Sequence, residues 1–132
     1  MNITNTEKLI KDFPVLYAGV SKSLMESLMS FGFECGDGWF DLIYDLSKKV
    51  SKLDPKCEAM QVKEKFGGLR FYTGATTHEV WDVIDEYEER SYGICEQCGS
   101  AENVSQTKGG WIITLCEKCH KERERPCPVN EE

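Results

Sequence analysis

The sequence Cys95-Glu96-Gln97-Cys98 is separated by seventeen residues from a second pair of the same form, Cys116-Glu117-Lys118-Cys119. Two Cys-x2-Cys pairs at this spacing are typical of a four-cysteine zinc site. Each short pair forms a tight turn that directs two thiolates at one ion, and Gly99 suits such a turn. The spacing therefore predicts one Zn²⁺ ion with four ligands: Cys95, Cys98, Cys116 and Cys119.

The residues around these pairs outline a zinc ribbon or treble clef. We expect short strands near Val104 and at Trp111–Thr114, joined by a turn at Lys108-Gly109-Gly110. A helix is expected from Glu117 to about Arg125. Four thiolates complete a tetrahedral shell and leave no position for a water nucleophile, so the metal is expected to be structural.

The remaining cysteines do not show ligand spacing. Cys35, Cys57 and Cys127 are expected to be buried or free thiols, and His120, beside Cys119, is the alternative fourth ligand. The first residues of the chain carry neither a basic start nor an apolar stretch. Seven cysteines in such a chain favour metal ligands over a disulfide framework, which predicts a protein of the cytosol.

The 132 residues have a hydrophobic fraction of 40% and a charged fraction of 30%, as in ordinary globular proteins. The formal net charge is −7, which is unfavourable for nucleic-acid binding if the charge is evenly spread. It is uneven, because residues 77–102 hold eight acidic side chains and one basic one. Residues 56–75 instead hold four basic and two acidic side chains, so a local basic patch is expected there.

Apolar side chains recur at helical spacing in several segments. A helix over Asn5–Asp12 is expected to stop before Pro14. Ser23 and Glu26 have capping-box spacing at the start of a second helix, which ends at Gly32. Two longer helices are expected, one capped by Asp37 and one opened by a capping box from Thr76 to Glu79. Their apolar stripes are Trp39, Leu42, Ile43, Leu46, Val50 and Leu53 in the first, and Val80, Val83, Ile84 and Tyr87 in the second.

Between Glu58 and Thr73 the apolar period changes to two, which predicts a β-hairpin. A two-residue turn at Gly67-Gly68 would place Lys65 opposite Arg70 and Lys63 opposite Tyr72. The apolar face then carries Met60, Val62, Phe66, Leu69 and Phe71, with Glu64 as an anomaly. The other face carries Gln61, Lys63, Lys65, Arg70 and Tyr72.

The basic face of this hairpin has two interpretations. Like charges placed directly opposite each other across strands are unfavourable, so these cations require a compensating anion. That anion is either a carboxylate of the same protein or a ligand, such as a phosphorylated small molecule or a nucleotide. The predicted ligand-binding residues are Lys63, Lys65, Arg70 and Tyr72, with Tyr72 able to stack on a base.

Residues 115–121 resemble the closing zinc half of HNH-type nucleases. Those enzymes need catalytic histidines between the two cysteine pairs, and residues 99–115 contain none. The chain has only His78 and His120, and it has no phosphate-binding glycine loop and no nucleophile elbow. We therefore expect no enzymatic activity and no catalytic residues.

Three stretches together resemble a family of small uncharacterised bacteriophage and prophage proteins: Cys35–Ile43, Val62–Tyr72, and the cysteine region from Glu89 to His120. The resemblance covers about Phe33 to His120. It implies expression in the cytosol of an infected bacterium and an accessory role. Small phage accessory proteins commonly neutralise host factors, including nucleotide signals of host defence, which by analogy is one expected role.

The sequence thus predicts an α+β fold in which N-terminal helices pack on a β-hairpin, followed by a helix and a four-cysteine zinc module. The expected divisions are an α+β domain at 1–93, a zinc-binding module at 94–126 and a tail at 127–132. The expected function is non-enzymatic binding of an anionic ligand, a phosphorylated molecule or a nucleotide, in a role against host defence. The alternative is a protein-interaction module that acts on a host protein through its zinc module or its acidic helix, which carries Asp82, Asp85, Glu86 and Glu89.

Overall fold

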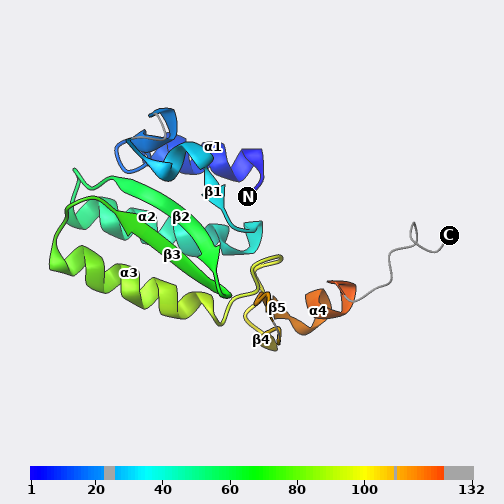
Figure 1. Cartoon of the computed structure of the whole chain (residues 1–132). Coiled ribbons are helices and arrows are strands. Elements are labelled where there is room, and N and C mark those ends of the chain that lie inside the picture. The colour runs from blue at the N-terminus through cyan, green and yellow to red at the C-terminus, as the bar shows by residue number, and fades with distance from the viewer. Residues whose placement is uncertain (23–25, 109, 124–132) are drawn as a thin grey trace.

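A computed structural model describes residues 1–22, 26–108 and 110–123. In these residues the chain is α+β, as expected, with a three-stranded sheet, four α-helices and a two-stranded sheet beside the cysteines (Figure 1). Three single-turn 3-10 helices, η1 to η3, connect the larger elements. In chain order the elements are α1 (Ile3–Asp12), η1 (Ala18–Ser21), η2 (Leu28–Phe31), β1 (Phe33–Glu34), η3 (Asp37–Trp39), α2 (Phe40–Leu53), β2 (Ala59–Lys65), β3 (Gly68–Thr73), α3 (His78–Ser91), β4 (Val104–Gln106), β5 (Thr114–Cys116) and α4 (Glu117–Arg123).

The N-terminal helix α1 ends at Asp12, as the following proline predicts. Its N-cap is Asn2, whose side-chain oxygen accepts a hydrogen bond from the Asn5 backbone N–H at 2.8 Å. The expected Ser23–Glu26 capping box falls largely on residues 23–25, outside the described residues. The turn that follows is the 3-10 helix η2, which is capped by Ser27 and ends at Gly32 with a φ of 79°.

The prediction that Asp37 caps α2 is wrong. Asp37 lies one turn earlier, in η3, and α2 begins at Phe40 without a side-chain cap. The Asp37 carboxylate instead accepts hydrogen bonds from the Asn2 backbone N–H at 2.7 Å and from the Asn5 side-chain amide at 3.1 Å. It therefore ties the start of α1 to the start of α2. The stripe of α2 is buried as expected except at its end, where Leu53 is 41% exposed.

The three-stranded sheet has the order β1-β2-β3, with β1 parallel and β3 antiparallel to β2. The hairpin turn consists of Phe66 and Gly67, with φ values of 55° and 85°, and not of Gly67 and Gly68. Positive φ at both positions is the geometry of a type I′ turn. The expected pairing is therefore wrong by one residue: Lys63 faces Arg70, and Lys65 faces Gly68.

The main core lies between the sheet and helices α2 and α3, and α1 with the 3-10 helices η1 and η2 closes the other edge (Figure 1). Val62, Leu69 and Phe71 are buried on the inner face of the sheet, as the period-two pattern predicts. The largest fully buried side chains are Trp39, Tyr17 and Tyr87. Phe66 was expected on this apolar face, but the turn leaves it 63% exposed. Cys35 and Cys57 are buried free thiols, as expected.

Helix α3 covers the free edge of β3. It begins after Thr77, not Thr76 as expected, and the Thr77 hydroxyl accepts a hydrogen bond from the Val80 backbone N–H at 3.3 Å. Backbone N–H groups on the outer edge of a sheet require partners. The Leu69 N–H donates to the Ser91 hydroxyl at 2.9 Å, and the Phe71 N–H donates to the Glu88 carboxylate at 2.8 Å. Side chains of α3 thus replace the missing fourth strand.

Replacement of Ser91 by alanine should lower the free energy of unfolding by about 1–3 kcal/mol, because the buried Leu69 N–H loses its acceptor. The matched control is Ser21→Ala, since the Ser21 hydroxyl makes its single described hydrogen bond at the surface and should change stability by less than about 0.5 kcal/mol. Urea unfolding followed by circular dichroism measures both. Equal stability of the two variants would show that α3 does not satisfy the edge of β3.

Candidate metal centre

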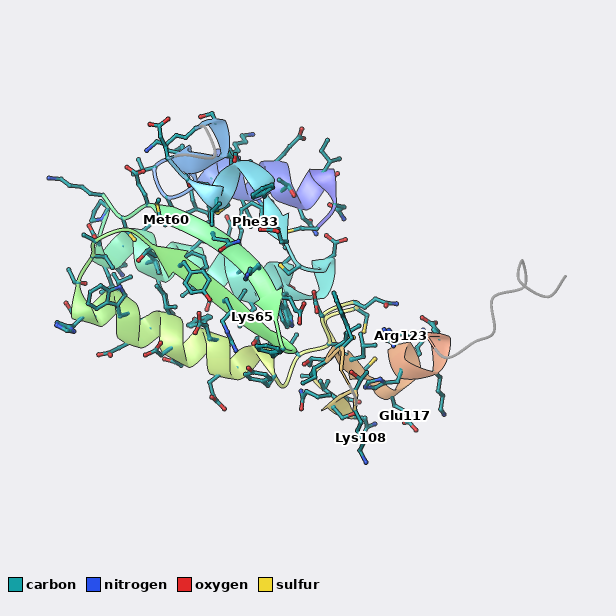
Figure 2. All side chains as sticks on the ribbon, viewed as in Figure 1. Phe33, Met60, Lys65, Lys108, Glu117 and Arg123 are labelled. Atoms are coloured by element: carbon teal, nitrogen blue, oxygen red, sulfur yellow. The ribbon has the colours of Figure 1, made fainter. Side chains whose placement is uncertain are left out.

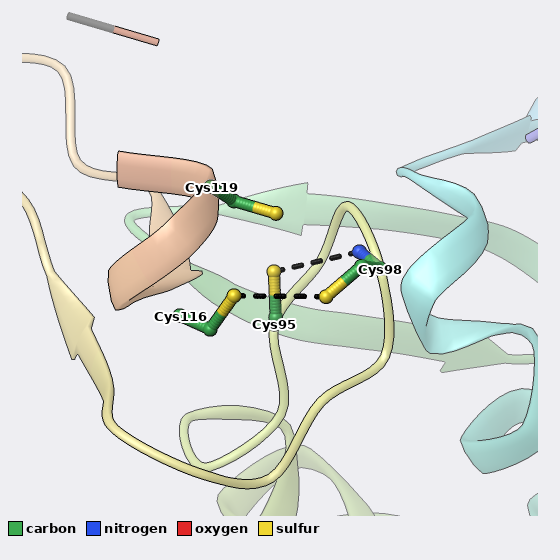
Figure 3. Close-up of side chains that lie close together, drawn as sticks. All are labelled: Cys95, Cys98, Cys116 and Cys119. Atoms are coloured by element: carbon green, nitrogen blue, oxygen red, sulfur yellow. Dashed lines mark hydrogen bonds between the residues drawn. The ribbon is translucent and has the colours of Figure 1, made fainter. Parts of the chain in front are cut away.

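The four predicted ligands come from three pieces of structure: a turn, a strand and a helix. Cys95 and Cys98 lie in the turn that follows α3, Cys116 is the last residue of β5, and Cys119 lies in the first turn of α4. Their sulfur atoms all lie within 4.8 Å of one another and face a common space (Figure 3). Strand β5 begins at Thr114, three residues later than expected, and therefore carries Cys116 directly into the helix.

The sulfur positions fit a tetrahedral metal ion. A Zn–S bond of about 2.3 Å in tetrahedral geometry places two sulfurs roughly 3.8 Å apart. The Cys98 and Cys116 sulfurs are 3.6 Å apart, and no disulfide joins any of the four. Cys95, Cys116 and Cys119 are buried, whereas Cys98 is exposed at the outer edge. This cluster is able to bind a metal ion.

The first pair forms a knuckle whose backbone N–H groups point at sulfur. The Cys98 N–H donates to the Cys95 sulfur at 3.4 Å (Figure 3). The Gly99 N–H donates to the Cys95 carbonyl at 2.9 Å and closes the turn. Gly99 has a φ of 85°, as the turn requires. Burial raises the pKa of the Cys95 thiol, but the N–H groups of Cys98, Cys116 and Gln97 outweigh it and bring this pKa to about 7. The knuckle therefore stabilises a thiolate.

The fourth sulfur shows why a cation is needed. Burial, together with the proximity of the other three cysteine side chains, raises the pKa of Cys119. Four thiolates this close repel one another, so they ionise together only around a positive ion. His120, the alternative ligand, points elsewhere: its Nε2 contacts the Ser105 carbonyl at 3.0 Å and links α4 to β4. The four-cysteine set is thus the one that the geometry favours.

The knuckle docks on the turn that precedes α2. The Glu96 carbonyl accepts a hydrogen bond from the Gly38 N–H at 2.7 Å, and the Glu96 carboxylate accepts one from the Gly36 N–H at 2.9 Å. The indole N–H of Trp39 donates to the Ile94 carbonyl at 2.9 Å. Glycine is required at both positions. A Cβ atom on Gly36 would lie 2.4 Å from the Glu96 carbonyl oxygen, and one on Gly38 would lie 2.1 Å from the Cys95 carbonyl oxygen.

The β4–β5 sheet also contacts the tip of the main hairpin. The Thr114 hydroxyl, which is fully buried, donates to the Gly67 carbonyl, and the Gln106 amide donates to the Tyr92 carbonyl at 3.0 Å. Sequence reasoning missed both this contact and the docking on Gly36 and Gly38. The paired glycines around Asp37, just before a buried tryptophan, were the available signal. The domain boundary after residue 93 stays a prediction, and many polar contacts cross it.

The four predicted ligand-binding residues lie on the open face of the three-stranded sheet. Lys63 and Arg70 are cross-strand partners, and Tyr72, 42% exposed, faces Gln61. Lys65 lies farther along the same face, toward the hairpin end that adjoins the β4–β5 sheet (Figure 2). The structure therefore places these side chains on one face, in a different register from the one expected.

The charges on this face are only partly compensated. The Arg70 guanidinium donates one hydrogen bond to the Leu69 carbonyl at 3.0 Å and one to the Tyr92 hydroxyl at 3.2 Å. Glu34 of β1 is the strand neighbour of Lys63, but its carboxylate accepts a hydrogen bond from Gln61. Within the described residues, no ion pair involves Lys63, Lys65 or Arg70.

Comparisons of the chain with protein-family models, with curated proteins and with solved structures find no match. Among the described residues, no helix combines the length and the apolar character needed to cross a bilayer. What the protein does must therefore be argued from its own geometry.

Docking of the knuckle should fail in a Gly38→Ala variant, because the new Cβ would lie 2.1 Å from the Cys95 carbonyl oxygen. The expected loss is about 3 kcal/mol of unfolding free energy, at the upper end for overpacking of a rigid contact. Gly74→Ala is the control, since no atom lies within 4 Å of its added Cβ. Thermal unfolding monitored by circular dichroism compares the two. A Gly38→Ala protein as stable as the control would contradict the docking.

The cysteine cluster predicts one tightly held metal ion per chain. Cys116→Ser should abolish stoichiometric binding, whereas Cys57→Ser, at a buried thiol outside the cluster, should retain one ion. Elemental mass spectrometry of desalted protein gives the stoichiometry. Chelation should also lower the unfolding midpoint of the wild type strongly, because structural zinc sites contribute on the order of 10 kcal/mol in isolated finger peptides. A wild-type protein without metal would exclude the site.

Proposed function

We propose that the metal is zinc and that it is structural. Four thiolates in a tetrahedral arrangement favour Zn²⁺ over the hard cations Mg²⁺ and Ca²⁺. Cys95, Cys98, Cys116 and Cys119 fill the four positions of such an ion, so no open position remains for a substrate or water. Bound zinc would fix the knuckle that contacts the turn before α2.

We further propose that the protein is not an enzyme. Its histidines support this: His78 packs edge-on against the Trp81 ring in the first turn of α3, and His120 contacts Ser105. Within the described residues, neither imidazole forms a hydrogen bond with a cysteine sulfur. The buried thiol of Cys35 has its pKa raised to about 12, mainly by burial, which makes it a poor nucleophile.

The proposed activity is binding of an anionic ligand on the open sheet face. The observation that carries it is the cross-strand pair Lys63–Arg70, two cations placed side by side without an ion pair in the described structure. Such a pair is unfavourable unless an anion lies across it. A phosphate group could accept hydrogen bonds from both side chains, while the exposed ring of Tyr72 on the same face would stack on a base.

A role in bacteriophage biology rests on the sequence resemblance alone. If it holds, the protein acts in the cytosol of the infected bacterium, and sequestration of a host nucleotide signal is the function that best joins this setting to a phosphate-binding face. The alternative is a protein-interaction module. Its support is the outer side of α3, where four carboxylates are exposed: Asp82, Asp85, Glu86 and Glu89.

Thermal unfolding of the zinc-loaded protein against a panel of linear and cyclic nucleotides tests the anion site. A ligand at about 100 times its dissociation constant should add about 2.7 kcal/mol to the unfolding free energy. Lys63→Glu and Arg70→Gln should abolish the shift. Lys48→Glu, a charge reversal at an exposed position of α2, is the matched control and should retain it.

Two results would count against the proposal. If no nucleotide raises the midpoint of the wild-type protein, the open face does not bind nucleotides, and the acidic side of α3 becomes the better candidate. If a nucleotide raises the midpoint equally in the wild type and in both Lys63 and Arg70 variants, a ligand binds, but elsewhere.

A further inference from the structure

Phe66 and Trp111 are the most exposed aromatic side chains of the described residues, at 63% and 74%. Phe66 lies at the tip of the β2–β3 hairpin, and Trp111 lies in the loop before β5. Both line one cavity of about 250 Å³ at the junction of the hairpin and the β4–β5 sheet. Two large aromatic rings are therefore exposed to solvent at one place, where the β2–β3 hairpin meets the β4–β5 sheet.

Folding does not explain the aromatic residue at position 66. Its φ of 55° is a left-handed conformation that turns usually assign to Gly, Asn or Asp. A phenylalanine there is conformationally unfavourable and also leaves its ring in water. In the described structure the ring forms no ring–ring pair, and its cation–π contact is with the Lys65 ammonium, 5.5 Å from the ring centroid. Because neither the backbone conformation nor the exposure of Phe66 stabilises the fold, its aromatic ring points to a functional role.

A second cavity adjoins the first and is acidic. It has a volume of about 370 Å³, within the range of roughly 300–1,000 Å³ that small-ligand sites occupy. Its lining includes the carboxylates of Asp37, Glu64 and Glu96, and it shares Glu64 and Trp111 with the first cavity. An exposed indole ring thus stands between an aromatic pocket and an acid-lined one.

The three carboxylates are positioned but not neutralised. Each accepts a hydrogen bond from a backbone N–H group, and none forms an ion pair within the described residues. The nearby cations are the Met1 ammonium, which donates to a backbone carbonyl at 2.6 Å, and Lys65 at the rim of the first cavity. Because the three carboxylates line one cavity and form no ion pair in the described residues, a cation that enters the cavity would meet uncompensated negative charge.

We propose that this surface, formed by Phe66, Trp111 and the carboxylates of Asp37, Glu64 and Glu96, docks a basic segment of a partner protein. An arginine or lysine side chain of the partner enters the acid-lined cavity, beside the Trp111 ring. An apolar side chain of the same segment packs between Phe66 and Trp111. Exposed aromatic anchors beside a charged cavity are the features that give protein interfaces their affinity and their specificity.

The charge of the surface favours a basic segment over an acidic or anionic partner. An acidic peptide, a nucleic acid or an anionic membrane surface would meet three carboxylates on a chain of formal net charge −7. The surface shares only Lys65 with the proposed anion site, and it lies at the junction with the β4–β5 sheet and not on the open sheet face. The two proposals therefore stand or fall separately.

Selection from a displayed library of random twelve-residue peptides on immobilised zinc-loaded protein tests the inference. The enriched peptides should carry arginine or lysine next to an aliphatic or aromatic residue. Their affinity, measured by fluorescence anisotropy with the labelled peptide, should fall at least about tenfold in Trp111→Ala and in Glu96→Gln. Gln at position 96 can still accept the Gly36 hydrogen bond, so this variant should fold.

The controls match each change in kind. Trp81→Ala removes another exposed indole ring, on α3, and Glu7→Gln neutralises an exposed acid on α1; both should keep wild-type affinity. One metal ion per chain in every variant confirms that the knuckle is intact. Enrichment of acidic or neutral peptides, equal binding to the wild type and to Trp111→Ala, or no enrichment at all would overturn the proposal.

Discussion

The rest of the structure depends on the contact between the cysteine knuckle and the turn before α2. This turn offers its Gly36 and Gly38 N–H groups to Glu96, and Trp39 adds its indole N–H to the Ile94 carbonyl. Trp39 is fully buried in the main core, so the same residue belongs to the core and to the support of the cysteine cluster. A metal ion that fixes the knuckle therefore also fixes the start of α2. Coupling of this kind makes metal binding part of the folding free energy.

The main sheet shows how a small fold satisfies its polar groups without more strands. Strand β3 has a free edge, and Ser91 and Glu88 of α3 accept hydrogen bonds from its backbone N–H groups. At the turn, Glu64, which stands on the inner face of the hairpin, accepts a hydrogen bond from the Gly67 N–H at 2.8 Å. Within the described part of the chain, no buried polar side-chain atom lacks a partner. The acidic residue that the apolar pattern could not explain thus supports the turn and lines the acidic cavity.

The two surfaces proposed to bind ligands carry opposite charges. The open sheet face presents Lys63 and Arg70 side by side, and the junction near the cysteine cluster presents carboxylates with exposed aromatic rings. Each combines charges that the described structure leaves without ion pairs, which is costly for stability alone. Because the hairpin contributes to both, its turn geometry sets how far apart the two surfaces lie.

The sequence by itself determined the pairing of cysteines in the cluster, because two residues between paired cysteines bring their sulfurs together through a local turn. It also determined the positions of α1, α2 and α3 and the buried faces of α2, α3 and the hairpin, since periods of 3.6 and two depend only on local geometry. It did not determine the hairpin register, because Phe66-Gly67 and Gly67-Gly68 are both two-residue turns. Tertiary packing decided it: a Cβ on Gly68 would lie 2.4 Å from the Tyr92 ring, so that glycine is needed in the strand. The docking of the knuckle and the acidic cavity likewise depend on residues about sixty positions apart, which no local pattern relates.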